Sequence, residues 1–151
     1  MASRSIESPV DLLTLHATDG AIVRLDWGGA SPKGDDPVLD MAAQQLSEYF
    51  ARERQSFELS LDPGTTSFQR AFAAALCAIP YGETRTYGDL ARDLGVSPQA
   101  IGQACGANRI PVLIPCHRVL AANGLGGYSG AGGVEAKVAL LKLEGAASLL
   151  I

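Results

Sequence analysis

The chain has 151 residues, of which 47% are hydrophobic and 19% are charged, and its formal net charge is −4. This composition excludes intrinsic disorder and collagen-like repeats, and a chain of this length can bury a core without staples. No apolar run approaches the roughly 20 residues of a membrane span. Three cysteines and no secretory pattern at the N-terminus lead us to expect a reduced, cytoplasmic protein without a disulfide framework.

Charge is distributed unevenly along the chain. Residues 1–66 hold five basic and eleven acidic residues, a net charge of −6, whereas residues 67–151 hold seven basic and five acidic residues, a net charge of +2. The asymmetry is a weak hint that the second half meets an anion, but two solvated faces of different composition explain it more simply. Any electrostatic attraction to DNA would therefore be local.

The first part of the chain is predicted to be a small sheet with one helix. Residues 12–17 and 21–27 flank an Asp-Gly turn and predict a hairpin, and alternation over 57–61 predicts a third strand. Between them, Asp36 followed by a proline predicts the start of a helix. The side chains expected to share one face of their strand or helix are Val23, Leu25, Trp27, Val38, Met41, Ala42, Leu46, Tyr49 and Phe50.

The second part of the chain is predicted to be helical. Apolar residues recur at helical spacing over 68–79. Thr86 caps a short helix that Gly95 ends, and Ser97 caps another that runs to about Cys105. Two short helices joined by a glycine-containing turn are typical of a DNA-binding helix-turn-helix, although many such hairpins bind nothing.

Cys116 marks the most informative segment, because it stands between a proline and His117 after an apolar run that we interpret as strand-like. A structural cysteine is a small, inert, buried hydrophobe, and we assign that role to Cys77 and Cys105. For Cys116, the histidine can raise the thiolate fraction directly or through one water, and Arg118 adds positive charge. Neighbours in an extended segment point in opposite directions, so the pairing needs a bend or a bridging water.

The end of the chain adds a glycine-rich loop and an acid. Residues 123–133 contain six glycines but lack the spacing and the Lys-Ser/Thr of a phosphate-binding loop. The last helix ends at Glu144, an unfavourable place for an acid, so Glu144 either has a specific partner or is a solvated surface residue. The histidines and cysteines show no metal-ligand spacing, and we expect no metal.

Taken together, these motifs resemble the O6-alkylguanine-DNA alkyltransferases, also called methylated-DNA–protein-cysteine methyltransferases, over nearly the whole chain. The segments that carry the resemblance, in order, are 79–84, 86–88, 106–108, 115–119, 127–130 and 140–145. The resemblance implies an α/β (α+β) fold with an N-terminal ribonuclease-H-like sheet and helix, residues 1–64. It also implies a C-terminal winged helix-turn-helix domain, residues 65–151.

The implied function is DNA repair. A member of this family flips O6-alkylguanine out of the duplex and transfers the alkyl group irreversibly to its own cysteine, without a cofactor. The everted base is needed because the reacting carbon cannot be reached inside a duplex. The mechanism requires one thiol held ionised in a crevice that admits a nucleobase.

The resemblance also assigns the residues that carry out the transfer. Cys116 matches the alkyl acceptor, and His117 and Glu144 match the base and acid that make its thiolate through water. Tyr87 matches the residue that donates a proton to the guanine ring and helps to turn the nucleotide. Asn108 matches the hinge residue that braces the active-site turn.

Further residues are expected to hold the guanine. Main-chain groups of Cys116 and Val119 match those that read the guanine edge. Tyr128 and Ser129 match a loop that closes over the base, with Ser129 near the alkylated oxygen. Lys137 matches a lysine near the pocket.

The implied partner is double-stranded DNA that contains alkylated guanine, bound in its minor groove by a monomer that can cluster on DNA. Small residues on the second short helix suit close approach without strong sequence preference. The residues expected to contact DNA are Tyr87, Gln99, Ala100, Gly102, Arg109 and Arg118.

Three positions depart from the family pattern. Gln99 stands where the family has an arginine that is inserted into the base stack, so we expect weaker flipping or weaker DNA binding. Arg109 stands where a proline is common and partly restores local charge. Phe72-Ala73 replaces an aliphatic–tryptophan pair, which we interpret as repacking of the core.

Two other functions remain open. One is a module that senses alkylated DNA without transferring anything. The other is a cysteine hydrolase that uses Cys116, His117 and Glu144 and turns over repeatedly.

Overall fold

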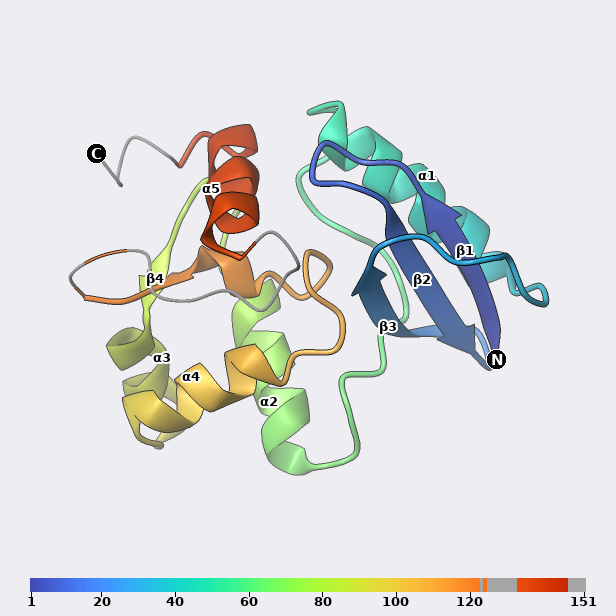
Figure 1. Cartoon of the computed structure of the whole chain (residues 1–151). Coiled ribbons are helices and arrows are strands. Elements are labelled where there is room, and N and C mark those ends of the chain that lie inside the picture. The colour runs from blue at the N-terminus through green and yellow to red at the C-terminus, as the bar shows by residue number, and fades with distance from the viewer. Residues whose placement is uncertain (123, 125–132, 147–151) are drawn as a thin grey trace. The chain divides into compact units, whose positions relative to one another are not determined.

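The computed structural model describes residues 1–122, 124 and 133–146. The chain divides into two compact units, Met1–Asp62 and Pro63–Ile151, each with its own helices and strands (Figure 1). The mixed α/β class expected from the sequence is confirmed. Within the described ranges, the helices lack the length and hydropathy that crossing a bilayer requires.

The first unit is an antiparallel sheet packed against one long helix. Its strands β1 (Ala2–Ile6), β2 (Leu13–Thr18) and β3 (Ala21–Trp27) lie in the order β1-β2-β3, and α1 (Pro37–Phe50) contacts all three. The predicted hairpin is therefore confirmed as β2 and β3.

Helix α1 begins where the sequence predicts. The Asp36 carboxylate accepts the N–H of Val38 at 3.1 Å, and the proline between them has no N–H to satisfy. The expected stripe is only partly right, because Met41 is 50% exposed. Met41 lies outside the buried face, which is formed by Val38, Leu39, Ala42, Gln45, Leu46 and Tyr49.

A β-bulge changes which side chains of β3 reach the core. The register between β2 and β3 shifts at His16/Ala17, so that Ala17 pairs with Ile22. Ile22 and Leu25 are buried, whereas Val23 is only half-buried. The predicted alternating face through Val23 is therefore wrong, because an extra residue in one strand reverses the facing of those beyond it.

The third strand predicted at 57–61 is also wrong, since the sheet's third strand is the more polar β1 at the N-terminus. Within 57–61, the only pairing is a single bridge between Leu61 and Ile22. Instead of pairing with a strand, the backbone of Glu58 is hydrogen-bonded to the Gln45 side chain. Gln45 Oε1 accepts the Glu58 N–H at 2.8 Å, and Gln45 Nε2 donates to the Glu58 carbonyl at 3.2 Å.

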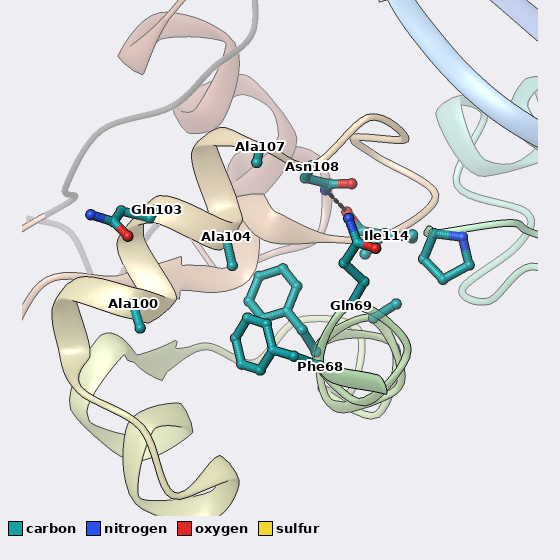
Figure 2. A pocket seen from close by; sticks show the side chains of 11 residues that line it. Phe68, Gln69, Ala100, Gln103, Ala104, Ala107, Asn108 and Ile114 are labelled. Carbon is teal, nitrogen blue, oxygen red and sulfur yellow. Dashed lines mark hydrogen bonds between the residues drawn. The ribbon is translucent and has the colours of Figure 1, made fainter. Parts of the chain in front are cut away.

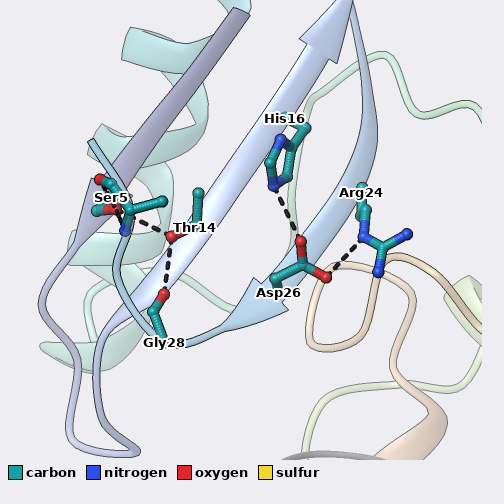
Figure 3. Close-up of polar contacts among 7 residues, drawn as sticks. Ser5, Thr14, His16, Arg24, Asp26 and Gly28 are labelled. Atoms are coloured by element: carbon teal, nitrogen blue, oxygen red, sulfur yellow. Dashed lines mark hydrogen bonds and ion pairs between the residues drawn. The ribbon is translucent and has the colours of Figure 1, made fainter. Parts of the chain in front are cut away.

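Polar contacts link the three strands of the sheet (Figure 3). Asp26 joins two neighbours, with His16 Nε2 at 3.0 Å from its Oδ2 and Arg24 Nε at 2.6 Å from its Oδ1. Thr14 Oγ1 lies 2.9 Å from Ser5 Oγ and donates to the Gly28 carbonyl at 2.7 Å. These contacts fix the register of β2 against both of its neighbours.

The second unit is mainly helical, with four α-helices described. Two very short strands, β4 and β5, pair in parallel, and a 3₁₀ turn, η1, precedes β5. The elements are α2 (Ser67–Cys77), β4 (Arg85–Thr86), α3 (Tyr87–Leu94), α4 (Pro98–Gly106), η1 (Cys116–Arg118), β5 (Val119–Leu120) and α5 (Val134–Leu143).

Helices α3 and α4 form the predicted helix-turn-helix. Thr86 and Asp89 form a capping box at the start of α3, and Gly95 ends that helix with φ +69°, a conformation that glycine adopts without strain. Ser97 Oγ then accepts the Ala100 N–H at 3.1 Å and starts α4. Both caps were readable from the sequence because each depends on a short local pattern.

The apolar run before Cys116 is not the strand that the sequence suggested. Residues 111–114 form a tight turn closed by a bridge between Pro111 and Ile114, and Val112 has φ +72°. The 3₁₀ turn η1 follows at once and supplies the bend that the Cys-His pair needs.

We expect Gln45→Ala to lower the free energy of unfolding by about 1–3 kcal/mol, because the buried Gln45 amide makes two hydrogen bonds to the backbone of Glu58 and both are lost. Urea denaturation measures this. Gln44→Ala, an exposed neighbour on α1, is the control and should change stability by less than about 0.5 kcal/mol. Equal values for the two variants would contradict this account of residues 57–61.

Candidate active site

Cys116 is the first residue of η1 and is held by main-chain hydrogen bonds. Its N–H donates to the Ile114 carbonyl at 2.8 Å, and the Arg118 N–H donates to the Pro115 carbonyl at 3.0 Å. The residue is only 2% exposed, so the thiol is enclosed, whereas we expected a crevice that admits a nucleobase.

Asn108 ties both ends of the turn that leads to Cys116. Its Nδ2 donates to the Ile114 carbonyl at 2.9 Å, and its Oδ1 accepts the Ile110 N–H at 3.0 Å. These contacts fit the bracing role implied for Asn108. The local geometry of the turn therefore depends on one amide side chain.

His117 and Glu144 form a fully buried pair. Their Nε2 and Oε2 atoms lie 2.7 Å apart, and neither side chain is exposed. Burial lowers the pKa of His117 even though Glu144 raises it, so the ring is neutral at physiological pH. An ionised carboxylate only accepts, so Nε2 carries the proton and Nδ1 carries the lone pair.

The other ring nitrogen is available as a base. His117 Nδ1 is buried and has no hydrogen-bond partner in the part of the chain that the structure describes. Such an unpaired buried acceptor is costly and is typical of a functional group. It belongs to the residue directly after Cys116.

Arg118 holds Glu144 in its ionised form. Its Nε and one terminal nitrogen donate to the two carboxylate oxygens of Glu144 at 2.8 and 2.9 Å, and the other terminal nitrogen donates to the Ile79 carbonyl at 2.8 Å. Burial alone would raise the pKa of Glu144, but the hydrogen bonds from His117 and Arg118 lower it to about 2. Glu144 therefore has the specific partners that its unfavourable helix position suggested.

Tyr81 supports this cluster from the loop after α2. The Arg118 guanidinium lies 5.8 Å from the centre of its ring, within cation–π range. The Tyr81 hydroxyl donates to the Leu143 carbonyl at 3.1 Å, next to Glu144. The roles of Arg118 and Tyr81 were not predicted from the sequence, and the signal that pointed toward them was the acid at a helix end, for which a specific partner was one of two alternatives.

Lys137 is fully buried on α5. Its Nζ donates to the Val119 carbonyl at 2.7 Å, and the Val119 N–H bonds to the Cys116 carbonyl. Burial lowers the pKa of Lys137, while the neighbouring thiols of Cys105 and Cys116 raise it. The carbonyls of Cys116 and Val119, which belong to the main-chain groups expected to read guanine, therefore each already accept one hydrogen bond.

Tyr87 and Cys105 lie in the electrostatic neighbourhood of Cys116. Burial raises the pKa of Tyr87, and both thiols add to the effect, so its hydroxyl keeps its proton at neutral pH. Burial, reinforced by Cys116, raises the pKa of Cys105 to about 12, which fits the inert thiol that we expected. Cys77, expected to be buried, is exposed because it occupies the last turn of α2.

Two family models match the chain. "6-O-methylguanine DNA methyltransferase, ribonuclease-like domain" matches residues 1–63, and "6-O-methylguanine DNA methyltransferase, DNA binding domain" matches residues 67–146. The chain belongs to the 6-O-methylguanine DNA methyltransferase family.

Relatives within this family are similar over most of their length. The methylated-DNA–protein-cysteine methyltransferase of Mycolicibacterium paratuberculosis is 39% identical in sequence to this chain, and the match covers 93% of this chain and 90% of the relative. That of Methanosarcina barkeri is also 39% identical, and the match covers 92% of this chain and 94% of the relative. Among solved structures, the Mycobacterium tuberculosis OGT in complex with DNA has a TM-score of 0.83 at 39% identity and covers 94% of this chain and 92% of its own.

The residues expected to contact DNA do not all lie at the surface. Gln99, Gly102 and Arg109 are exposed on or just after α4, and Ala100 is half-buried. Arg118 is only 6% exposed and its guanidinium is used by Glu144 and Ile79, so its assignment to DNA contact is wrong.

Some predictions for this family member are not tested by the structure. Tyr128 and Ser129, expected to close over the base, lie outside the described residues. Among the residues that are described, no group of three or more His, Cys, Asp or Glu side chains could hold a metal ion.

We expect Glu144→Gln to lower the free energy of unfolding at pH 7 by about 3–5 kcal/mol, because it leaves the buried Arg118 charge without its counter-ion. The pKa of Glu144 is lowered in the folded protein from 4.5 to about 2. Its stabilisation is therefore complete above pH 4.5 and is lost as the pH falls toward 2.

The difference in free energy of unfolding between the wild-type protein and Glu144→Gln should therefore become smaller as the pH falls from 4.5 toward 2. Urea denaturation at a series of pH values measures this difference. Glu135→Gln, an exposed acid in the first turn of the same helix, is the control and should show neither effect. A constant difference from pH 7 to pH 2 would contradict the proposed ionised state of Glu144.

Proposed function

We propose that this chain repairs DNA by transferring an alkyl group from O6 of guanine to the Sγ of Cys116, once per molecule. The observation that carries the proposal is the buried His117–Glu144 pair, which leaves an unpaired basic nitrogen on the residue next to Cys116. Membership of the 6-O-methylguanine DNA methyltransferase family supports it.

The first step is formation of the thiolate. His117 Nδ1 takes the proton of Cys116, directly or through one water, and the imidazolium formed is stabilised by Glu144. Glu144 is already ionised because Arg118 pairs with both of its oxygens. The ion pair between protonated His117 and Glu144 thus replaces the solvation that a charged histidine would have in water.

In the second step, the thiolate sulfur attacks the alkyl carbon. A carbon–sulfur bond forms, the bond from that carbon to guanine O6 breaks, and its electron pair passes to the guanine. The Tyr87 hydroxyl donates a proton to the ring, so that neutral guanine leaves. The thioether has no route back to a thiol, which makes the reaction stoichiometric.

We propose that DNA is bound in its minor groove through α4, by a monomer that can cluster on the duplex. The exposed, side-chain-free Gly102 and the neighbouring Gln99 support close approach to a sugar-phosphate backbone. Since Cys116 is enclosed, entry of the everted base includes an opening step at the acceptor turn. We assign these tasks to residues 65–151 and regard residues 1–64 as the ribonuclease-H-like subdomain.

The direct test mixes the protein with duplex DNA that carries one O6-methylguanine and measures its intact mass. We expect a gain of one methyl group per molecule, no gain for Cys116→Ser, and a normal gain for Cys77→Ser, which replaces a cysteine that has no role in the proposed transfer. DNA binding without any gain would indicate a sensing module instead. Repeated turnover of an ester or amide would indicate a hydrolase.

A second test concerns Gln99, the uncharged residue where the family has an arginine. We expect Gln99→Arg to strengthen DNA binding and speed alkyl transfer, because an inserted guanidinium fills the space of the everted base and attracts phosphates. Gln103→Arg adds the same charge elsewhere on α4 and is the control. If both variants improve binding equally, or neither does, the assignment of Gln99 is wrong.

A further inference from the structure

A cavity of about 300 Å³ lies between α2 and α4, on the side of the DNA-binding helix that faces α2 (Figure 2). Phe68 and Phe72 of α2 line one wall, and Ala104 of α4 lies across from Phe68. A volume of this size lies at the lower end of the range for small-molecule sites. The proposed alkyl transfer does not place the guanine in this cavity, although Ala100 and Asn108, which line it, have roles in that proposal.

The walls favour a flat, apolar ligand. The rings of Phe68 and Phe72 are stacked, with centroids 6.1 Å apart and planes inclined by 28°. Phe68 is 36% exposed, so an aromatic face remains uncovered. Ala73 of the same helix is buried and adds only a methyl group to the lining. Aromatic rings gain most from a planar partner.

One end of the cavity is polar. Figure 2 shows Gln69 reaching from α2 toward Asn108 and Ile114. Gln69 Oε1 accepts the Thr66 N–H at 3.1 Å, and the NH₂ group of the same amide carries two donor hydrogens. Asn108 uses one N–H of its amide for Ile114 and has a second. This end therefore suits a hydrogen-bond acceptor on the ligand.

The absence of charged residues from the lining of the cavity favours an uncharged ligand. None of the eleven residues that line the cavity is charged. A phosphate or carboxylate would lose its hydration there without gaining a counter-ion, whereas a neutral molecule would not. DNA backbone and anionic metabolites are therefore poor occupants.

We propose that this cavity binds a small, uncharged, planar aromatic molecule with an acceptor at one edge. Asn108 lines the cavity and also braces the turn that leads to Cys116, so the bound molecule alters the environment of that turn. The test of this binding site needs no transfer activity.

The test uses benzamide as the probe and follows backbone and side-chain amides of the full chain by NMR. We expect saturable binding with a Kd on the order of 1 mM. Shifts should be confined to α2, α4 and residues 108–116, and should include the Asn108 side-chain amide. Benzoate has the same shape but carries a charge, and cyclohexanecarboxamide lacks the planar ring, so both should bind at least about tenfold more weakly.

Two variants fill the cavity from opposite walls. Ala73→Trp and Ala104→Leu should each weaken benzamide binding at least about tenfold, and the second serves if the first does not fold. Ala74→Trp places the same indole on the exposed neighbouring position of α2 and should leave the Kd unchanged. Undiminished binding in both filled variants, equal binding of benzoate, or no shift at Asn108 would overturn the proposal.

Discussion

The second unit is organised around one buried carboxylate. Glu144, at the end of α5, binds Arg118 through both of its oxygens and His117 through one, and none of its side chain is exposed. An ionised group so placed is stable only because both partners are present. The same contacts join the last helix to η1, so one cluster fixes both the fold and the state of the histidine beside Cys116.

In this cluster, the charged groups and the proposed proton acceptor are different residues. Arg118 and Glu144 form a buried ion pair, and the neutral ring of His117, the residue that directly follows Cys116, is hydrogen-bonded to Glu144 through Nε2. When His117 takes up a proton, a counter-ion is already in place and no large reorganisation is needed. Burial raises the pKa values of Tyr87 and Cys105, so both of these electrostatic neighbours of Cys116 keep their protons at neutral pH.

The helices could be predicted from the sequence because their ends depend on local patterns. Contacts between residues far apart in the sequence could not be predicted in this way. The caps at Thr86, Gly95 and Ser97 each depend on neighbouring residues. By contrast, apolar and polar residues alternate over 57–61 as in a strand, yet the backbone of this segment is hydrogen-bonded to the side chain of Gln45 on α1. Arg118 looked like a DNA contact because only the folded chain brings it to Glu144, 26 residues away.

The most direct test of the central claim is the tautomer and charge of His117, read from the ¹⁵N chemical shifts of its ring across a pH titration. We predict a neutral ring at pH 7 with the proton on Nε2 and a bare Nδ1, and a pKa below the ordinary value of 6.5. A proton on Nδ1, or a ring that is charged at pH 7, would contradict the account, because no base would then stand beside Cys116.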